Sequence, residues 1–174
     1  MGSKSKNKGK GFERDIAKYL SDLYGDNFVR IFSSGAYTGG MNNFRKNTLT
    51  EGQIRANKGD ISPPDDWNHF NCECKAYSSF TFHKLLHNEK IPLLEEFIDQ
   101  TMEAADDGDV NIIFMKFDYV GRYIAFQMPR PFVCDKFIDY VSKNHGTWRF
   151  TEFESFFEKN KDIFEKECKR IIDS

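Results

Sequence analysis

The sequence predicts an α/β domain in which helices flank a mixed β-sheet, because segments of helical periodicity alternate with segments typical of strands. Residues 69–77 (HFNCECKAY) alternate polar and apolar side chains without a break, which is typical of a strand with one buried face. Residues 110–117 (VNIIFMKF) are almost all apolar, which indicates a strand covered on both faces. A chain of 174 residues is long enough for one domain with a substantial core.

The other elements follow from periodicity and from start and stop signals. Apolar residues at helical spacing begin at Gly11 and end before Gly25, and proline suits the first turn of a helix at Pro92. Thr151, with Glu154 three residues later, resembles a capping box at the start of a last helix. The expected elements are, in order, a helix from residue 11, strands at 28–34, 58–62 and 69–77, a helix at 92–105, strands at 110–117 and 122–128, and closing helices at 132–143 and 151–172.

Composition suggests a flexible basic arm at residues 1–10 and a single domain at residues 11–174, with a core at 11–128 and a helical extension at 129–174. Net charge is only −2, yet residues 1–58 contain 11 Lys and Arg against 5 Asp and Glu. This basic first third could bind a polyanion, or it could be a solvated surface. No apolar run is long enough to span a membrane, and no signal peptide is visible, so we expect a cytoplasmic or nucleoid-associated protein.

The four cysteines do not form a convincing zinc site. Cys72 and Cys74 are one pair with His69 nearby, but no second pair completes a tetrahedral set. Buried reduced thiols are the favoured interpretation.

An acidic and a basic residue on one face of the strand at 69–77 indicate a candidate catalytic site. Glu73 and Lys75 lie two residues apart, so both side chains enter the same space about 6.7 Å apart along the strand. A carboxylate that holds a hard divalent cation, beside an ammonium that assists an attacking water, is what a metal-dependent nuclease needs. An isolated Glu-x-Lys on an exposed sheet face is common, but Asp60 lies on the preceding strand candidate, where it could stand beside Glu73. Two carboxylates and the backbone carbonyl of Cys74 would suffice for Mg²⁺.

The order Gly59-Asp60, twelve intervening residues, then Glu73-Cys74-Lys75 resembles the PD-(D/E)XK nuclease superfamily. With KGKGFERD at residues 8–15 and RIFSSGAYTGG at residues 30–40, the chain looks like the archaeal Holliday-junction resolvases and their phage relatives. The resemblance implies a restriction-endonuclease-like fold, cleavage of branched DNA with Mg²⁺ or Mn²⁺, and a homodimer. Residues 129–174 contain no motif that matches the family.

The resemblance also implies roles for individual residues. Glu13 would be a metal-site acid, although acids are also common at helix starts for structural reasons. Asp60 and Glu73 would be metal ligands, Lys75 the catalytic lysine, and Ser34 a neighbour of the scissile phosphate. Gln100 would point at the site or be an ordinary helix residue. Further phosphate contacts are expected from Lys10, Arg30, Arg45, Lys46, Arg55 and Lys58.

Other functions remain open from the sequence. An exonuclease or a restriction-like nuclease could use the same core, and a nucleic-acid-binding module could use the basic first third without any chemistry.

Overall fold

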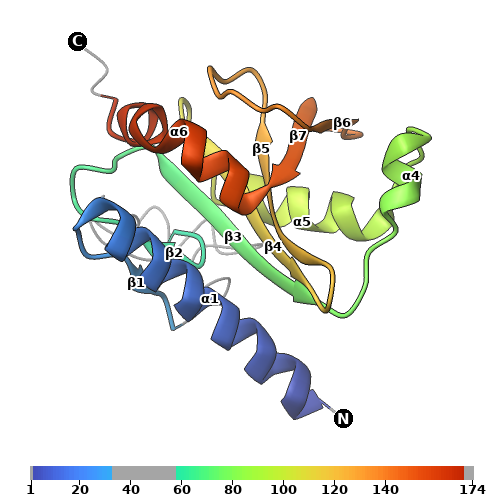
Figure 1. Cartoon of the computed structure of the whole chain (residues 1–174), viewed down its shortest axis with the longest axis horizontal. Coiled ribbons are helices and arrows are strands. Elements are labelled where there is room, and N and C mark those ends of the chain that lie inside the picture. Colours follow the sequence, from blue (N-terminus) through green and yellow to red (C-terminus); the bar gives the residue numbers. More distant parts are fainter. Residues whose placement is uncertain (1, 33–57, 171–174) are drawn as a thin grey trace.

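A five-stranded mixed sheet forms the centre of the molecule in the computed structural model, which describes residues 2–32 and 58–170 (Figure 1). In chain order the elements are α1 (Gly2–Tyr24), β1 (Val29–Arg30), β2 (Ile61–Ser62), β3 (Phe70–Tyr77), α4 (Phe82–Leu86), α5 (Pro92–Glu103), β4 (Val110–Phe117), β5 (Gly121–Gln127), β6 (Ile138–Val141), β7 (Thr147–Glu152) and α6 (Phe153–Cys168). The strand order is β3-β4-β5-β7-β6, so β3 is an edge strand of this sheet. The predicted α/β class, with a sheet flanked by helices, is confirmed.

Helices cover both faces of the sheet (Figure 1). One face packs against α1 and α6 through a core that includes Phe12, Cys72 and Phe164. The opposite face packs against α4 and α5 through a second core that includes Phe97 and Ile113.

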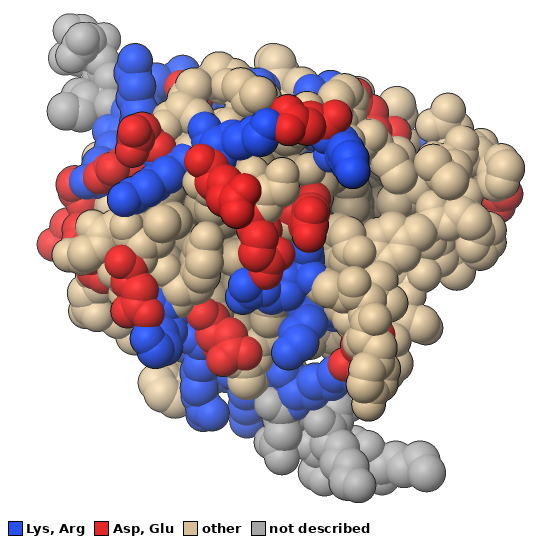
Figure 2. All heavy atoms as spheres, in the orientation of Figure 1, with Lys and Arg blue, Asp and Glu red and all other residues tan. Residues whose placement is uncertain are grey.

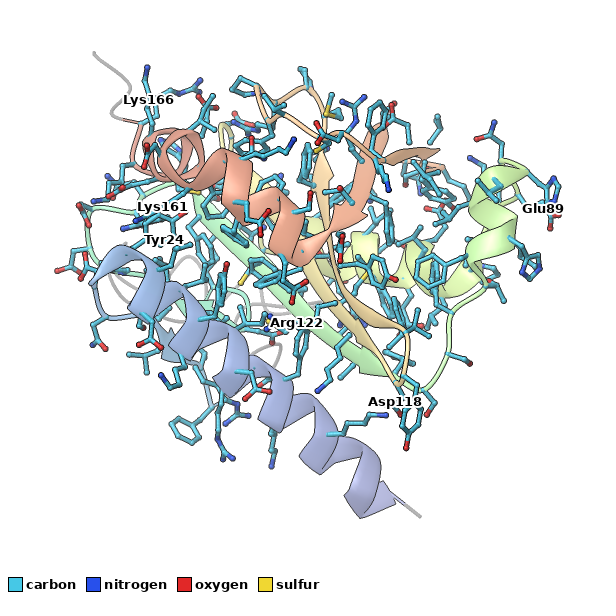
Figure 3. All side chains as sticks on the ribbon, in the orientation of Figure 1. Tyr24, Glu89, Asp118, Arg122, Lys161 and Lys166 are labelled. Carbon is cyan, nitrogen blue, oxygen red and sulfur yellow. The ribbon has the colours of Figure 1, made fainter. Side chains whose placement is uncertain are left out.

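Helices α1 and α6 are also joined to each other at the surface. The Tyr24 hydroxyl donates a hydrogen bond of 2.9 Å to the carbonyl of Lys161 (Figure 3). The sheet is therefore enclosed on this side by two helices that meet at the end of α1.

The register of β3 places Glu73 and Lys75 beside apolar residues of its neighbouring strand β4. β3 runs parallel to β4, with Glu73 beside Ile113 and Lys75 beside Met115. The alternation predicted for this strand is observed, because Cys72 and Cys74 enter the first core while Glu73 and Lys75 lie on the α5 side. β4 is buried along its length, as its apolar sequence predicts.

The two short strands before β3 do not join the central sheet. β1 and β2 pair antiparallel with each other, Val29 beside Ser62 and Arg30 beside Ile61. The expected strands at 28–34 and 58–62 thus shrink to two residues each within the part of the chain that the structure describes. Residues 33–34 of the first expected strand lie outside it.

Helix α1 starts earlier than predicted. The predicted start at Gly11 is wrong, because the helix begins at Gly2 and includes most of the expected arm. Apolar periodicity reports only the part of a helix that contacts the core, so it misses a first stretch that is rich in helix-forming lysine. Lys8 forms an ion pair with Asp118, which Figure 3 labels in the turn between β4 and β5, and this pair ties the early part of α1 to that turn. Across residues 2–32 and 58–170, no helix has the length and apolar character needed to span a membrane.

The expected helix at 132–143 is wrong. This segment follows a cis peptide bond at Met128–Pro129 and ends in β6, which pairs with β7 at the edge of the sheet. β7 was not predicted at all, and it moves the start of the last helix to Phe153. Thr151 therefore lies in a strand, where its hydroxyl donates to the carbonyl of Lys136 instead of capping α6. Pairing between two short strands depends on partners outside each segment, which local periodicity cannot detect.

Candidate active site

Strand β3 presents Glu73 and Lys75 on the same side, within contact of each other. The Lys75 ammonium lies 3.2 Å from a Glu73 carboxylate oxygen, and each side chain is 15% exposed. Neighbouring residues of a strand point to opposite faces, so the intervening Cys74 enters the core while its two neighbours share one space. The geometry expected from the sequence for this pair is present.

Asp60 reaches the same place from the open edge of β3. Its backbone N–H donates to the carbonyl of Cys72 at 3.1 Å, and its carboxylate accepts the N–H of Cys74 at 2.7 Å. Gly59 makes this approach possible, because its φ is +68° and an added Cβ would lie 2.4 Å from the carbonyl oxygen of Cys72. Only glycine adopts this conformation and this contact without strain.

Asp60 and Glu73 form a pair of acids in a poorly solvated place. Burial raises the pKa of Glu73 to about 7, and the charge of Asp60 adds to the increase, against the opposing effect of Lys75. A cation bound beside the two acids would offset both the loss of hydration of Glu73 and its repulsion from Asp60. Perturbed groups of this kind are concentrated at functional sites.

Lys75 is held in place by residues of α5. Its ammonium donates a hydrogen bond to the side-chain oxygen of Gln100 and lies 5.4 Å from the centre of the Phe97 ring. The structure thus brings Gln100 to the site through Lys75, a contact that sequence pattern alone could not distinguish from an exposed helix position.

Glu13 of α1 is near enough to Asp60 to feel its charge and has a cationic partner of its own. It forms an ion pair with Arg30 of β1, and both side chains are largely buried, at 14% and 10% exposed. Burial raises the pKa of Glu13, the hydrogen bond from Arg30 opposes this, and the nearby charge of Asp60 adds to the increase. Lys10 is close enough to favour the charged form of Glu13.

Comparison with known proteins finds a family that matches almost the whole chain. The family model described as "Phage putative PDDEXK endonuclease" matches residues 4–170. The chain belongs to this phage PD-(D/E)XK endonuclease family. No curated protein and no solved structure matches the chain. The match extends to residue 170, so the family includes the segment after residue 128 for which the sequence suggested no counterpart.

The residues gathered at this edge of β3 in the endonuclease fit a divalent cation. Two carboxylates lie together, and the carbonyl of Cys74 faces the same edge as its N–H, which contacts Asp60. Oxygen ligands of this kind suit Mg²⁺, which keeps several waters in its shell. Within the described ranges no three His, Cys, Asp or Glu side chains are gathered closely enough to hold a metal ion, so the backbone carbonyl and water are needed.

Other predicted site residues are placed differently or lie outside the described residues. Lys58 was expected to contact phosphate, but it is buried at 8% exposure and pairs with Asp106 and Asp109. Arg30 was also expected to contact phosphate, and its guanidinium is instead engaged with Glu13. The remaining predictions, which are Ser34, Arg45, Lys46 and Arg55, lie in the segment 33–57 outside the described part.

Helix α1 carries exposed basic side chains. Figure 2 shows Lys and Arg, interspersed with acids, over the part of this face where α1 lies, and Lys10, Arg14 and Lys18 of α1 are exposed. This region is continuous with the Glu13 side of the site, because Lys10 lies near Glu13 on the same helix.

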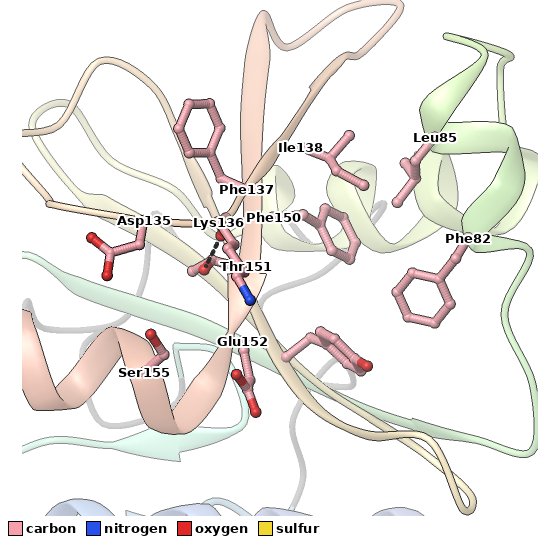
Figure 4. Close-up of a pocket in the computed structure, with 11 residues that line it drawn as sticks. Phe82, Leu85, Asp135, Lys136, Phe137, Ile138, Phe150, Thr151, Glu152 and Ser155 are labelled. Carbon is pink, nitrogen blue, oxygen red and sulfur yellow. Dashed lines mark hydrogen bonds between the residues drawn. The ribbon is translucent and has the colours of Figure 1, made fainter.

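A pocket of about 540 Å³ lies near the other edge of the sheet (Figure 4). Phe82 and Leu85 of α4 face Ile138 and Phe150 across it. Its lining contains none of the predicted site residues, so the candidate active site is defined by charge and hydrogen bonding at the edge strand β3 and not by this hollow.

Proposed function

We propose that this endonuclease hydrolyses phosphodiester bonds of DNA with Mg²⁺, and that Mn²⁺ substitutes for Mg²⁺. The observation that supports the proposal most directly is the meeting of Asp60, Glu73 and Lys75 at one edge of the sheet. Two acids and one amine in this arrangement match the requirements of metal-assisted phosphodiester hydrolysis.

Each residue has a defined part in the proposed reaction. Asp60, Glu73 and the Cys74 carbonyl would hold the cation, which supplies Lewis-acid polarisation of the phosphate and a more acidic bound water. Lys75 donates hydrogen bonds toward the attacking water and the negative charge that develops on the phosphate. Gln100 keeps the Lys75 ammonium in place through its side-chain oxygen.

The proposed substrate is branched DNA, and the proposed active form is a homodimer. The resemblance to junction resolvases supports both, because paired cuts across a junction need two sites related by a two-fold axis. Exposed Lys10 near Glu13, with exposed Arg14 and Lys18 farther along the same helix, supports a polyanionic substrate, since neutralisation of phosphates supplies much of the affinity for nucleic acid.

The test is cleavage of a panel of synthetic DNAs, with and without Mg²⁺. We expect four-way junctions to be cut faster than linear duplexes, flaps and single strands. Lys75→Ala should lower kcat by roughly 10²- to 10³-fold, as is typical for loss of a hydrogen-bond donor to developing negative charge, while DNA binding in a gel-shift assay stays close to wild type.

Lys143→Ala is the matched control, because Lys143 is an exposed lysine outside the site. Shortening from DNA ends only would favour an exonuclease, and cutting of linear duplex at a preferred sequence would favour a restriction-like enzyme. Salt-sensitive binding without any metal-dependent product would indicate a binding module and would contradict the proposal, as would normal cleavage by Lys75→Ala.

A further inference from the structure

Lys58 is a buried lysine immediately before the Gly-Asp pair of the candidate active site. It is 8% exposed, and its ammonium lies 2.9 Å from a carboxylate oxygen of Asp106 and pairs with the buried carboxylate of Asp109. Lysine is almost never fully buried unless it is paired. A paired and buried ammonium is poorly placed to bind the phosphates of DNA, so another role has to account for it.

The turn that holds Lys58 is itself firmly anchored. The Asp109 carboxylate accepts the N–H of Asp106 at 2.7 Å, which closes the turn between α5 and β4. Arg130 donates to the carbonyls of Gly108 and Asp109, and its guanidinium lies 3.3 Å from Glu167 of α6. The segment after residue 128 thus supports the turn from outside.

Only one residue separates Lys58 from Asp60, and that residue lies close against the backbone of β3. Gly59 is packed against the backbone of Cys72 at a positive φ. Asp60 is then held by its N–H on the Cys72 carbonyl and by its carboxylate on the Cys74 N–H. Displacement of Lys58 would be transmitted directly to the Asp60 carboxylate.

We propose that Lys58 is a positioning residue for Asp60, held by the Asp106–Asp109 turn and supported by Arg130 and Glu167. This inference rests on the proposed function, because it takes Asp60 to be a cation ligand. Ion pairs and hydrogen bonds behind a metal ligand orient it, and their removal weakens metal binding. The segment after residue 128 accordingly serves the active site although it carries none of the three motif residues.

The proposal is tested by binding of Mn²⁺ alone to the DNA-free protein, measured by electron paramagnetic resonance of the free ion. Lys58→Met keeps the length of the side chain and removes its charge. We expect a loss of Mn²⁺ affinity of roughly 10- to 100-fold, in line with the loss of groups that orient a metal ligand. In cleavage assays at fixed Mg²⁺, kcat should fall while KM for DNA stays within about twofold, because no substrate contact is removed.

Two further variants separate positioning from loss of folding. Asp109→Asn is nearly isosteric and should reproduce the loss of Mn²⁺ affinity, and combining it with Lys58→Met should add little, because both variants disrupt the same Lys58–Asp109 ion pair. Lys58→Arg keeps the positive charge and should bind Mn²⁺ more tightly than Lys58→Met does. Lys169→Met is the matched control, since Lys169 also pairs with two acids, Asp66 and Glu165, and should leave Mn²⁺ binding unchanged.

The outcomes distinguish this inference from the proposed function. If wild type binds no Mn²⁺, the proposed function fails. If wild type binds Mn²⁺ and folded Lys58→Met and Asp109→Asn bind it equally well, only the positioning role is overturned. A rise in KM with a weaker dependence on salt in Lys58→Met would also overturn it, because that result would identify Lys58 as a phosphate contact. If Lys58→Met does not fold, the Mn²⁺ affinity of Asp109→Asn decides.

Discussion

At the scale of single residues, the site contains acidic and basic side chains that are close together and largely buried. Glu73 stands between the negative charge of Asp60 and the positive charge of Lys75, and burial dominates the outcome. Glu13 has a similar environment but is paired with Arg30. A cation bound beside Glu73 would favour its ionised form.

This balance predicts how stability depends on pH. The pKa of Glu73 is about 7 in the folded protein, above the value of 4.5 expected when the chain is unfolded, so the folded state binds the proton more tightly. The contribution of Glu73 to stability should then fall as pH rises from about 4.5 to about 7, by up to about 3 kcal/mol. Glu73→Gln cannot ionise and should lack this fall, which urea unfolding of both proteins across this pH range would measure.

Magnesium should reverse this effect, because a cation favours the ionised carboxylate. At pH 8, Mg²⁺ should raise the Tm of wild type and leave the Tm of Glu73→Gln almost unchanged. Equal increases in the two proteins would place the cation elsewhere.

At the scale of elements, the site depends on how the turn before β2 approaches the edge of β3. Gly59 allows this approach in two ways, through its positive φ and through the absence of a side chain near Cys72. The edge position of β3 leaves backbone groups of Cys72 and Cys74 free for Asp60. A strand in the middle of the sheet would have both edges occupied by neighbouring strands.

Gly59→Ala should therefore destabilise the protein and impair metal binding. Gly25→Ala is a matched comparison, because Gly25 has a similar φ of +65° but no atom within 4 Å of an added Cβ. Both variants carry the strain of a positive φ, which costs on the order of 1 kcal/mol. We expect a larger loss of unfolding free energy in Gly59→Ala, together with weaker Mn²⁺ binding that Gly25→Ala does not show. Equal losses in both would mean that contact with Cys72 is unimportant.

At the scale of the whole molecule, the distribution of charge over the surface predicts DNA binding better than the net charge does. The formal net charge of −2 hides a basic first third, in which Lys10, Arg14 and Lys18 of α1 are exposed and Lys10 lies near Glu13. Helix α6 carries several acids along with its lysines, so its lysines lie in a less basic environment than those of α1. DNA is thus expected to bind along α1.

Lys10→Ala should weaken DNA binding about equally for all sequences and reduce the slope of log affinity against log salt by about 1. Lys166→Ala removes the same charge from α6, on the far side of the molecule from the N-terminal half of α1 (Figure 3), and should leave the slope unchanged. Fluorescence anisotropy at several salt concentrations, without Mg²⁺, measures both variants. If the two variants have the same slope, α1 is not the DNA-binding surface.

The sequence by itself determined the α/β class, the polar face of β3 that carries Glu73 and Lys75, and the motif that links them to Asp60. These features are encoded locally, because alternation along a strand needs only the residues of that strand. The tertiary structure alone decided that the segment at 132–143 supplies a sheet strand, that Arg30 pairs with Glu13, and that Lys58 is buried against Asp109, 51 residues away in sequence. Such contacts depend on the path of the whole chain, because a charged residue has the same local pattern whether it meets solvent, a phosphate or a buried partner.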